Sequence, residues 1–185
     1  MMKQNKSTMA TRTLAYCAML TALSVVFARL FSLMPEESAR FSFEAVPIFV
    51  SGMLFGPLAG GLVGFAADFV GCLFSPYGFN PIFCVPPILY GMFGGIFRSF
   101  LAKNVSIPRL AVSFLPPVVL GSVLYQSAAL AFVYYSSTFV EGLLLKLSTR
   151  SVQFAVTMVL DVLIVFFVFK AGVFERLGVW PPKKK

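Results

Sequence analysis

The stretch "EAVPIFVSGMLFGPLAGGLVGFAADFVGCLF", residues 44–74, decides how many times this chain crosses a membrane. Almost all of it is apolar, but "GPLAGG" at 56–61 interrupts it with glycines that stop a helix and a proline suited to starting the next one. The stretch is therefore either one long helix or two short ones. The choice determines the side of the membrane on which every later loop lies.

The composition is that of a membrane protein. Of the 185 residues, 58% are apolar and 12% are charged, which is outside the range of soluble globular proteins. The first apolar tract follows Lys3, Lys6 and Arg12, as in a secretory signal, but it is long and has no clear small-residue cleavage site. We interpret it as the retained first span of a single integral-membrane domain, residues 1–185. Further hydrophobic tracts leave little chain for a soluble domain; the full set is 14–33, 45–56, 59–74, 82–97, 110–135 and 151–169.

The distribution of basic residues favours two helices in the opening stretch. With two spans there and a cytoplasmic N-terminus, eleven basic residues lie inside (Lys3, Lys6, Arg12, Arg98, Lys103, Arg109, Lys170, Arg176, Lys183, Lys184, Lys185) and four outside (Arg29, Arg40, Lys146, Arg150). With one span the division becomes five inside and ten outside, against the positive-inside rule. We therefore predict an all-α membrane protein with both termini cytoplasmic and a ligand pocket near the extracellular side. The six expected transmembrane helices are 9–33, 43–56, 59–74, 82–100, 110–136 and 150–170.

Several function classes find no support in the residue content. The net charge of +8 is scattered over short loops and tails, unlike the basic face of a nucleic-acid-binding domain. Cys17, Cys72 and Cys84 have no metal-binding or redox spacing, so we interpret them as small core residues. The absence of histidine removes the commonest metal ligand and proton shuttle. We expect neither metal nor cofactor.

Two predicted helices carry polar residues on one face. In 59–74, Asp68 shares a face with Gly61, Gly64 and Gly71, a pattern that permits close helix packing. The Asp68 carboxylate could be paired with a cation, protonated or held by helix-terminal amides, because a bare charge within a span is costly. In 150–170 a polar stripe is either an interhelical hydrogen-bond seam or, near the predicted outer end, part of a ligand site; its members are Arg150, Gln153, Phe154, Thr157 and Asp161.

The first helix has a face of small residues. Ala15, Ala18 and Ala22 recur at spacings of three and four, which lets another helix approach closely. That helix could belong to the same bundle or to a different subunit. Arg29 falls on nearly the same side as Ala18, because eleven residues make about three turns.

Aromatic residues and arginines gather around the predicted outer loops. An interfacial aromatic belt accounts for some of the rings. The combination with three arginines is more specific, since it suits a flat, conjugated, anionic ligand that stacks on rings and forms forked hydrogen bonds through its carboxylates. The residues are Arg29, Arg40, Phe41, Phe43, Tyr77, Phe79, Phe83, Tyr125, Tyr134, Tyr135 and Arg150.

One segment resembles a known family. The stretch "RFSFEAVPIFVSGMLFGPLAGGLVGFAADFVGCLFSPYGFNPIF", residues 40–83, is similar to the folate-type substrate-binding (S) subunits of energy-coupling factor (ECF) vitamin transporters. The shared features are an Arg-x-Ser-Phe-x-x-x-Pro start, a Leu-Phe-Gly-Pro turn, an Ala-Asp pair and a Pro-x-Gly-x-x-x-Pro-x-Phe loop. "FNPIFCVPP" departs from the family by lacking a Phe-Thr-Leu run, and "AVP" replaces a bulkier residue before Pro47.

The resemblance implies a transport subunit rather than an enzyme. Such a subunit sits in the bacterial plasma membrane, captures folate outside with high affinity and delivers it by toppling within the bilayer. Its partners are a transmembrane coupling protein and two cytoplasmic ATPases. The chain itself has no GxxxxGK[ST] phosphate loop, so ATP hydrolysis is expected in those partners.

The resemblance also assigns roles to individual residues. Ala18 and Ala22, with Ala15, match the alanine motif that docks the coupling protein. Arg29 and Arg40 match the basic residues that flank the first outer loop, 80–83 the loop over the ligand, and Arg150 with Gln153 an Arg-x-x-Gln near the start of the last helix.

A specific binding hypothesis follows. The three arginines neutralise the glutamate carboxylates of folate, Phe43, Phe79, Phe83 and Tyr125 enclose its ring, and Asn80 or Gln153 reads its polar edge. The alternatives are an S subunit for another vitamin or precursor, a membrane enzyme of lipid metabolism, and a purely structural bundle. The enzyme would need a cluster of carboxylates, histidine or cysteine, and the sequence has no such motif around Asp68 or Asp161.

Overall fold

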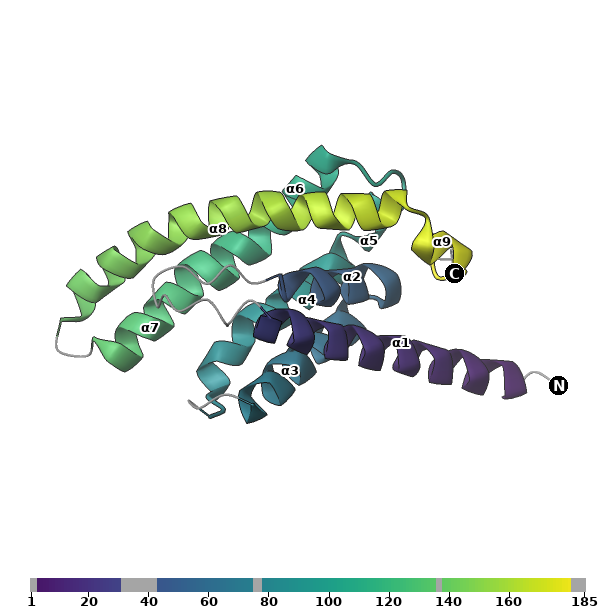
Figure 1. Cartoon of the computed structure of the whole chain (residues 1–185), viewed down its shortest axis with the longest axis horizontal. Helices are drawn as coiled ribbons and strands as arrows, with labels where there is room; N and C mark the ends of the chain where they lie inside the picture. Colours follow the sequence, from purple (N-terminus) through teal and green to yellow (C-terminus); the bar gives the residue numbers. More distant parts are fainter. Residues whose placement is uncertain (1–2, 31–42, 75–77, 136–137, 181–185) are drawn as a thin grey trace.

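The fold is all-helical throughout the part of the chain that the structure describes (Figure 1). The structure is a computed structural model; it describes residues 3–30, 43–74, 78–135 and 138–180, with side chains in the first helix from Thr11 to Ala28. The helices are α1 (Lys3–Leu30), α2 (Ala45–Phe55), α3 (Pro57–Leu73), η1 (Pro81–Cys84), α4 (Val85–Ile96), α5 (Arg98–Leu101), α6 (Ile107–Pro117), η2 (Val118–Tyr125), α7 (Gln126–Tyr134), α8 (Phe139–Lys170) and α9 (Val173–Arg176).

Six apolar helical segments follow one another in the predicted order. Three are long and apolar enough to cross a membrane, namely Thr11–Ala28, Ile107–Tyr134 and Phe139–Lys170. Three shorter ones are Ala45–Phe55, Pro57–Leu73 and Pro81–Ile96. Large apolar side chains cover much of the outer surface, which suits contact with lipid.

The chain turns sharply between α2 and α3, as "GPLAGG" predicts. Gly56 has φ of 102°, a conformation that only glycine adopts without strain. Its N–H donates to the carbonyl oxygen of Gly52 over 2.8 Å, and Pro57 then opens α3. The opening stretch therefore contains two helices.

Helices α2, α3 and α4 approach one another backbone to backbone. A Cβ atom at Gly91 of α4 would overlap the backbone of Gly60 in α3, and one at Gly52 of α2 would overlap the backbone of Gly91. The ring of Phe114 from α6 packs on Phe49 of α2, with centroids 3.9 Å apart. The centre of the bundle therefore depends on small residues on three helices.

The last long helix begins earlier than predicted. We expected Lys146 in an outer loop and Arg150 at the helix start, but α8 begins at Phe139. No proline interrupts 139–150, and the Lys146 ammonium lies 5.8 Å from the ring centroid of Tyr135 in the preceding connection. The two charges that suggested a loop, Lys146 and Arg150, therefore both lie within a helix.

A π-helical segment lies in the middle of the α6–α7 span. Pro116 and Pro117 end α6, and η2 then continues the helix with wider turns to Tyr125. Proline supplies no N–H to the regular helical ladder, and π-helical turns are common at functional sites. This segment packs against α4, α6, α7 and α8.

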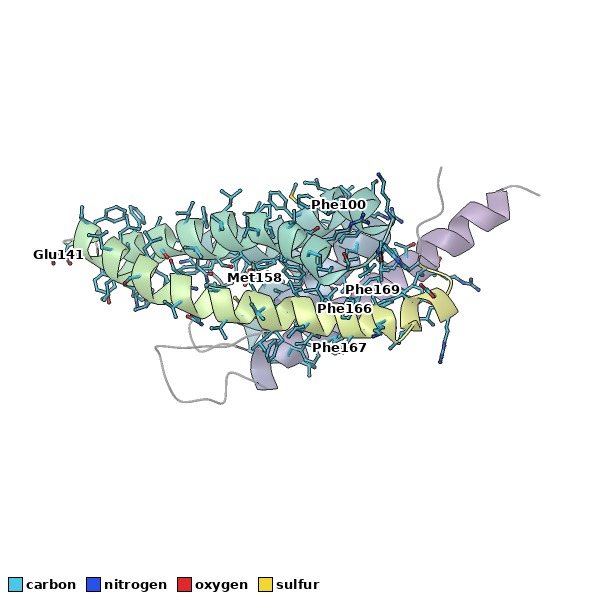
Figure 2. The ribbon with its side chains drawn as sticks, turned by 90° about the horizontal axis from the view of Figure 1, so that it is seen from above. Phe100, Glu141, Met158, Phe166, Phe167 and Phe169 are labelled. Carbon is cyan, nitrogen blue, oxygen red and sulfur yellow. The ribbon has the colours of Figure 1, made fainter. Side chains whose placement is uncertain are left out.

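The α7–α8 hairpin extends beyond the other helices. In both views its tip projects past α1–α4 (Figures 1 and 2), and Figure 2 labels Glu141 at that end of α8. Figure 2 labels Phe169 near the opposite end of α8, and Figure 1 shows α9 and the start of α1 towards that same end.

The glycine contacts give the first testable prediction. Gly91→Ala should lower the thermal unfolding temperature in detergent, because its methyl group overlaps the backbone of Gly60 and overpacking costs about 1–3 kcal/mol. The matched control is Gly71→Ala, because a Cβ atom there has no neighbour within 4 Å. Equal unfolding temperatures for the two variants would contradict the packing described here.

Candidate functional site

A polar cluster lies in the interior, centred on Tyr90 of α4. The Tyr90 hydroxyl is 3.1 Å from the Ser122 hydroxyl of η2, and both side chains are buried. Tyr90 is also within electrostatic range of Asp161, Glu44 and Arg150. These five residues, here called the Tyr90 cluster, come from α4, η2, α8 and the residue that precedes α2.

Helix α8 places Arg150 and Asp161 on one face. Eleven residues separate them, which is about three turns and about 16 Å along the helix. Between them Thr157 is buried, and its hydroxyl donates to the carbonyl oxygen of Gln153 over 3.0 Å. The Arg150 guanidinium lies 5.2 Å from the ring centroid of Phe154. The predicted polar stripe therefore faces the interior.

Three buried side-chain atoms on α7 and α8 have no hydrogen-bond partner. Among the described residues such atoms are Arg98 Nε, Ser127 Oγ, Arg150 Nε and Asp161 Oδ1, and the last three belong to α7 and α8. An unsatisfied buried polar group costs about 1–3 kcal/mol, and native proteins leave few of them. Helices α7 and α8, whose contact is called the α7–α8 seam, therefore carry both donor and acceptor atoms without a partner.

An apolar pocket adjoins this seam at the end where α7 and α8 meet. Its volume is about 380 Å³, within the range of about 300–1,000 Å³ typical of small-molecule sites. Tyr125 in its wall follows Ser122 by three residues, and Ala128 follows Ser127 directly. The pocket is open and has three aromatic rings in its wall; the lining residues are Ile82, Tyr125, Ala128, Ala129, Phe132 and Phe139.

The site residues predicted in and beside the loop at 80–83 lie in or next to η1. The Asn80 side-chain oxygen accepts a hydrogen bond from the Ile82 N–H over 3.1 Å, so this oxygen caps η1. Phe83 is half-buried, whereas the exposed Phe79 packs edge-on against Phe69, with centroids 5.2 Å apart.

The other residues predicted to bind the ligand do not lie in one place. Phe43 is half-buried just before α2, and Gln153 is half-buried on α8. Arg29 falls in the last turn of α1, but its side chain lies outside the described residues, as does all of Arg40. Tyr125 and Arg150 line the pocket and the seam, respectively.

Asp68 has a thiol as its partner. The Cys84 thiol donates to Asp68 Oδ2 over 2.8 Å. Cys84 is buried, as expected of a core residue, but it also satisfies an intramembrane carboxylate. This hydrogen bond joins α3 to η1, the segment that carries Phe83.

The alanine face of α1 points away from the described bundle. Ala15, Ala18 and Ala22 are all exposed. On another side of the same helix, the buried Ser24 hydroxyl donates to the carbonyl oxygen of Glu44 over 2.8 Å. The alanine face is therefore available to another subunit.

Sequence reasoning missed the centre of the polar cluster. Tyr90 and Ser122 lie in the apolar segments "VPPILYGMFGGI" and "VVLGSVLY", where neither residue forms part of a motif. One feature could have pointed to Tyr90: a tyrosine hydroxyl in an apolar span needs a hydrogen-bond partner.

The fold and site define a membrane-embedded binding protein: an all-helical chain with an apolar exterior, a pocket at one end and unpaired polar atoms beside it. The family model for the ECF-type riboflavin transporter S component matches residues 8–171. The chain belongs to this family. The expectation of an ECF S component, a transport subunit rather than an enzyme, is confirmed.

Two relatives resemble the chain. The folate transporter FolT of Clostridium novyi (strain NT) is 33% identical over 99 residues, which are 53% of this chain and 56% of that protein. The match thus spans just over half of the relative's length. The crystal structure of FolT bound with folic acid is 27% identical, with a TM-score of 0.62 over 82% of this chain and 94% of the other.

The Asp68–Cys84 contact gives a second prediction. Cys84→Ala removes the thiol donor of the Asp68 carboxylate, so we expect a lower unfolding temperature in detergent, corresponding to about 1–3 kcal/mol. Cys84→Ser retains a donor of similar size and should unfold near the wild-type temperature. If both variants behave alike, the hydrogen bond does not contribute to stability.

Proposed function

We propose that this chain is the folate-binding S component of an ECF importer. The observation that carries the proposal is the buried Arg150 Nε, which has no hydrogen-bond partner and belongs to the Tyr90 cluster. The similarity to FolT, whose crystal structure holds folic acid, supports the same ligand.

The proposed topology has six spans with both termini in the cytoplasm of a bacterial cell, in one integral-membrane domain of the plasma membrane. Two observations support it: the chain has six apolar segments, and the start of α1 and α9, near the two termini, lie towards the same end of the molecule (Figure 1). In this orientation Arg98, Lys103 and Arg109 lie on the cytoplasmic side, as the positive-inside rule favours. The α7–α8 tip and the pocket then lie on the outer side.

In the proposed binding mode the glutamate carboxylates of folate meet cations at the outer end of the site. Arg150 is one, and Arg29 and Arg40 are the others. Phe43, Phe79, Phe83 and Tyr125 enclose the aromatic part, and Asn80 or Gln153 hydrogen-bonds to it. The Asn80 amide N–H groups serve this role, since its side-chain oxygen caps η1.

Energy for uptake comes from partner subunits: a transmembrane coupling protein and two cytoplasmic ATPases. Ala15, Ala18 and Ala22 form the proposed docking face, because they are exposed and small and let a second helix pack closely.

Removing the Arg150 guanidinium tests the ligand assignment. Arg150→Ala should weaken folate binding to purified protein by about ten- to a hundredfold, since a charge-assisted hydrogen bond contributes about 1.5–3 kcal/mol. Isothermal titration calorimetry would measure the change. Lys146→Ala is the matched control, because this cation on the same helix faces Tyr135 and its loss should leave affinity unchanged.

Riboflavin is the second candidate ligand, since the matching family model is named for it. It has no carboxylate to pair with Arg150. Tight binding of riboflavin with no binding of folate would overturn the folate assignment.

The docking face gives a further prediction. Ala18→Trp should leave folate affinity unchanged and abolish folate uptake by cells that also express the coupling protein and ATPases, because an indole prevents close helix contact. Val159→Trp is the control, since Val159 is exposed on α8. Normal uptake by the Ala18 variant would exclude this surface as the docking face.

A further inference from the structure

The buried carboxylate of Asp161 has no role in the binding mode described above. Its side chain is 1% exposed, and Oδ1 has no hydrogen-bond partner. A carboxylate within a membrane span is costly unless it is paired or hydrated. Asp161 therefore needs a hydrogen-bond donor.

The neighbouring side chains do not supply that donor. The Thr157 hydroxyl donates to the carbonyl oxygen of Gln153, and the hydroxyls of Tyr90 and Ser122 bond to each other. Arg150 lies about 16 Å away along α8. Glu44, the other carboxylate of the Tyr90 cluster, adds negative charge rather than a donor.

We infer that Asp161 recognises the aminopyrimidine edge of the pterin ring and so selects a pterin ligand over a flavin. This inference rests on the proposed function and extends it. The 2-amino group and the ring N–H of a pterin are two adjacent donors, and the unpaired Oδ1 of Asp161 can accept a hydrogen bond from this edge.

The Tyr90–Ser122 pair suits the adjacent carbonyl of the same ring. Two hydroxyls that share one hydrogen bond leave one hydroxyl hydrogen unused. That hydrogen can be donated to the pterin oxygen next to the ring N–H. Acceptor and donor groups of the Tyr90 cluster thus complement one edge of the ligand.

The geometry of α8 matches the shape of the whole ligand. Folate is extended, with its donor edge at one end and its two carboxylates at the other. Arg150 and Asp161 lie on one face of α8, about 16 Å apart, with opposite charges in the matching order. Helix α8 therefore orients the ligand with the pterin towards the interior.

The same carboxylate disfavours riboflavin. The corresponding edge of a flavin has one N–H between two carbonyl groups. A carboxylate that accepts from this N–H is repelled by the partial negative charges of the two carbonyl oxygens. Specificity between similar ligands commonly comes from such a repulsive contact. Asp161 would thus distinguish this chain's ligand from the one for which the family model is named.

Ligand fragments separate the two ends of the site. With purified full-length protein in detergent, Asp161→Asn should weaken binding of folate and of pteroate, which lacks the glutamate, by about tenfold or more. Binding of p-aminobenzoyl-glutamate, which lacks the pterin, should not change. Asp68→Asn is the matched control, because that carboxylate pairs with Cys84, and it should bind all three ligands like the wild type.

A second measurement does not depend on the stability of one variant. Removing the 2-amino group from folate should weaken its binding to the wild type but cause no further loss in Asp161→Asn, because the two partners of one contact are not additive. Equal binding of folate and 2-deaminofolate by the wild type would overturn the inference, as would unchanged pteroate binding by Asp161→Asn. A wild-type protein that binds no folate would instead overturn the proposed function and this inference together.

Discussion

The bilayer supplies no water to the polar groups of a spanning helix, so each of them must be satisfied inside the protein or by a ligand. This constraint explains the arrangement of the polar side chains. Asp68 accepts a hydrogen bond from the Cys84 thiol in η1, and the Ser113 hydroxyl donates to the carbonyl oxygen of Arg109. The hydroxyls of Tyr90 and Ser122 form a hydrogen bond with each other. Three buried side-chain atoms on α7 and α8 have no hydrogen-bond partner within the described part of the protein, and our proposal assigns two of them, on Arg150 and Asp161, to the ligand.

Two kinds of packing divide the bundle. Glycines bring the backbones of α2, α3 and α4 together and fix one half. The other half, formed by η2, α7 and α8, contains the pocket, the π-helical turns and the unpaired atoms. The glycine-packed half therefore supplies Tyr90, while the half with the π-helical turns supplies Ser122, Arg150 and Asp161.

Local chemistry decided which features the sequence could predict. The turn at Gly56 was predictable because glycine and proline restrict the backbone in known ways. The inward face of Thr157 and Asp161 followed from helical periodicity. The start of α8 was not predictable, because Lys146 resembles a loop charge until Tyr135 is seen beside it. The Tyr90–Ser122 contact depends on the π-helical register of η2, which no hydrophobic pattern reveals.

The lengths of α2 and α8 have a consequence for the surrounding lipid. With 32 residues, α8 is about 48 Å long, whereas α2, with 11 residues, is about 16 Å long and almost entirely covered by protein. A hydrocarbon layer of about 30 Å matches neither helix. The part of α8 after Arg150, with 20 residues, is about 30 Å long and fits this layer, so the first turns of α8 project beyond it or the whole helix tilts, and the tilt depends on membrane thickness. Lipid chain length is therefore a physical variable that acts on the orientation of this protein.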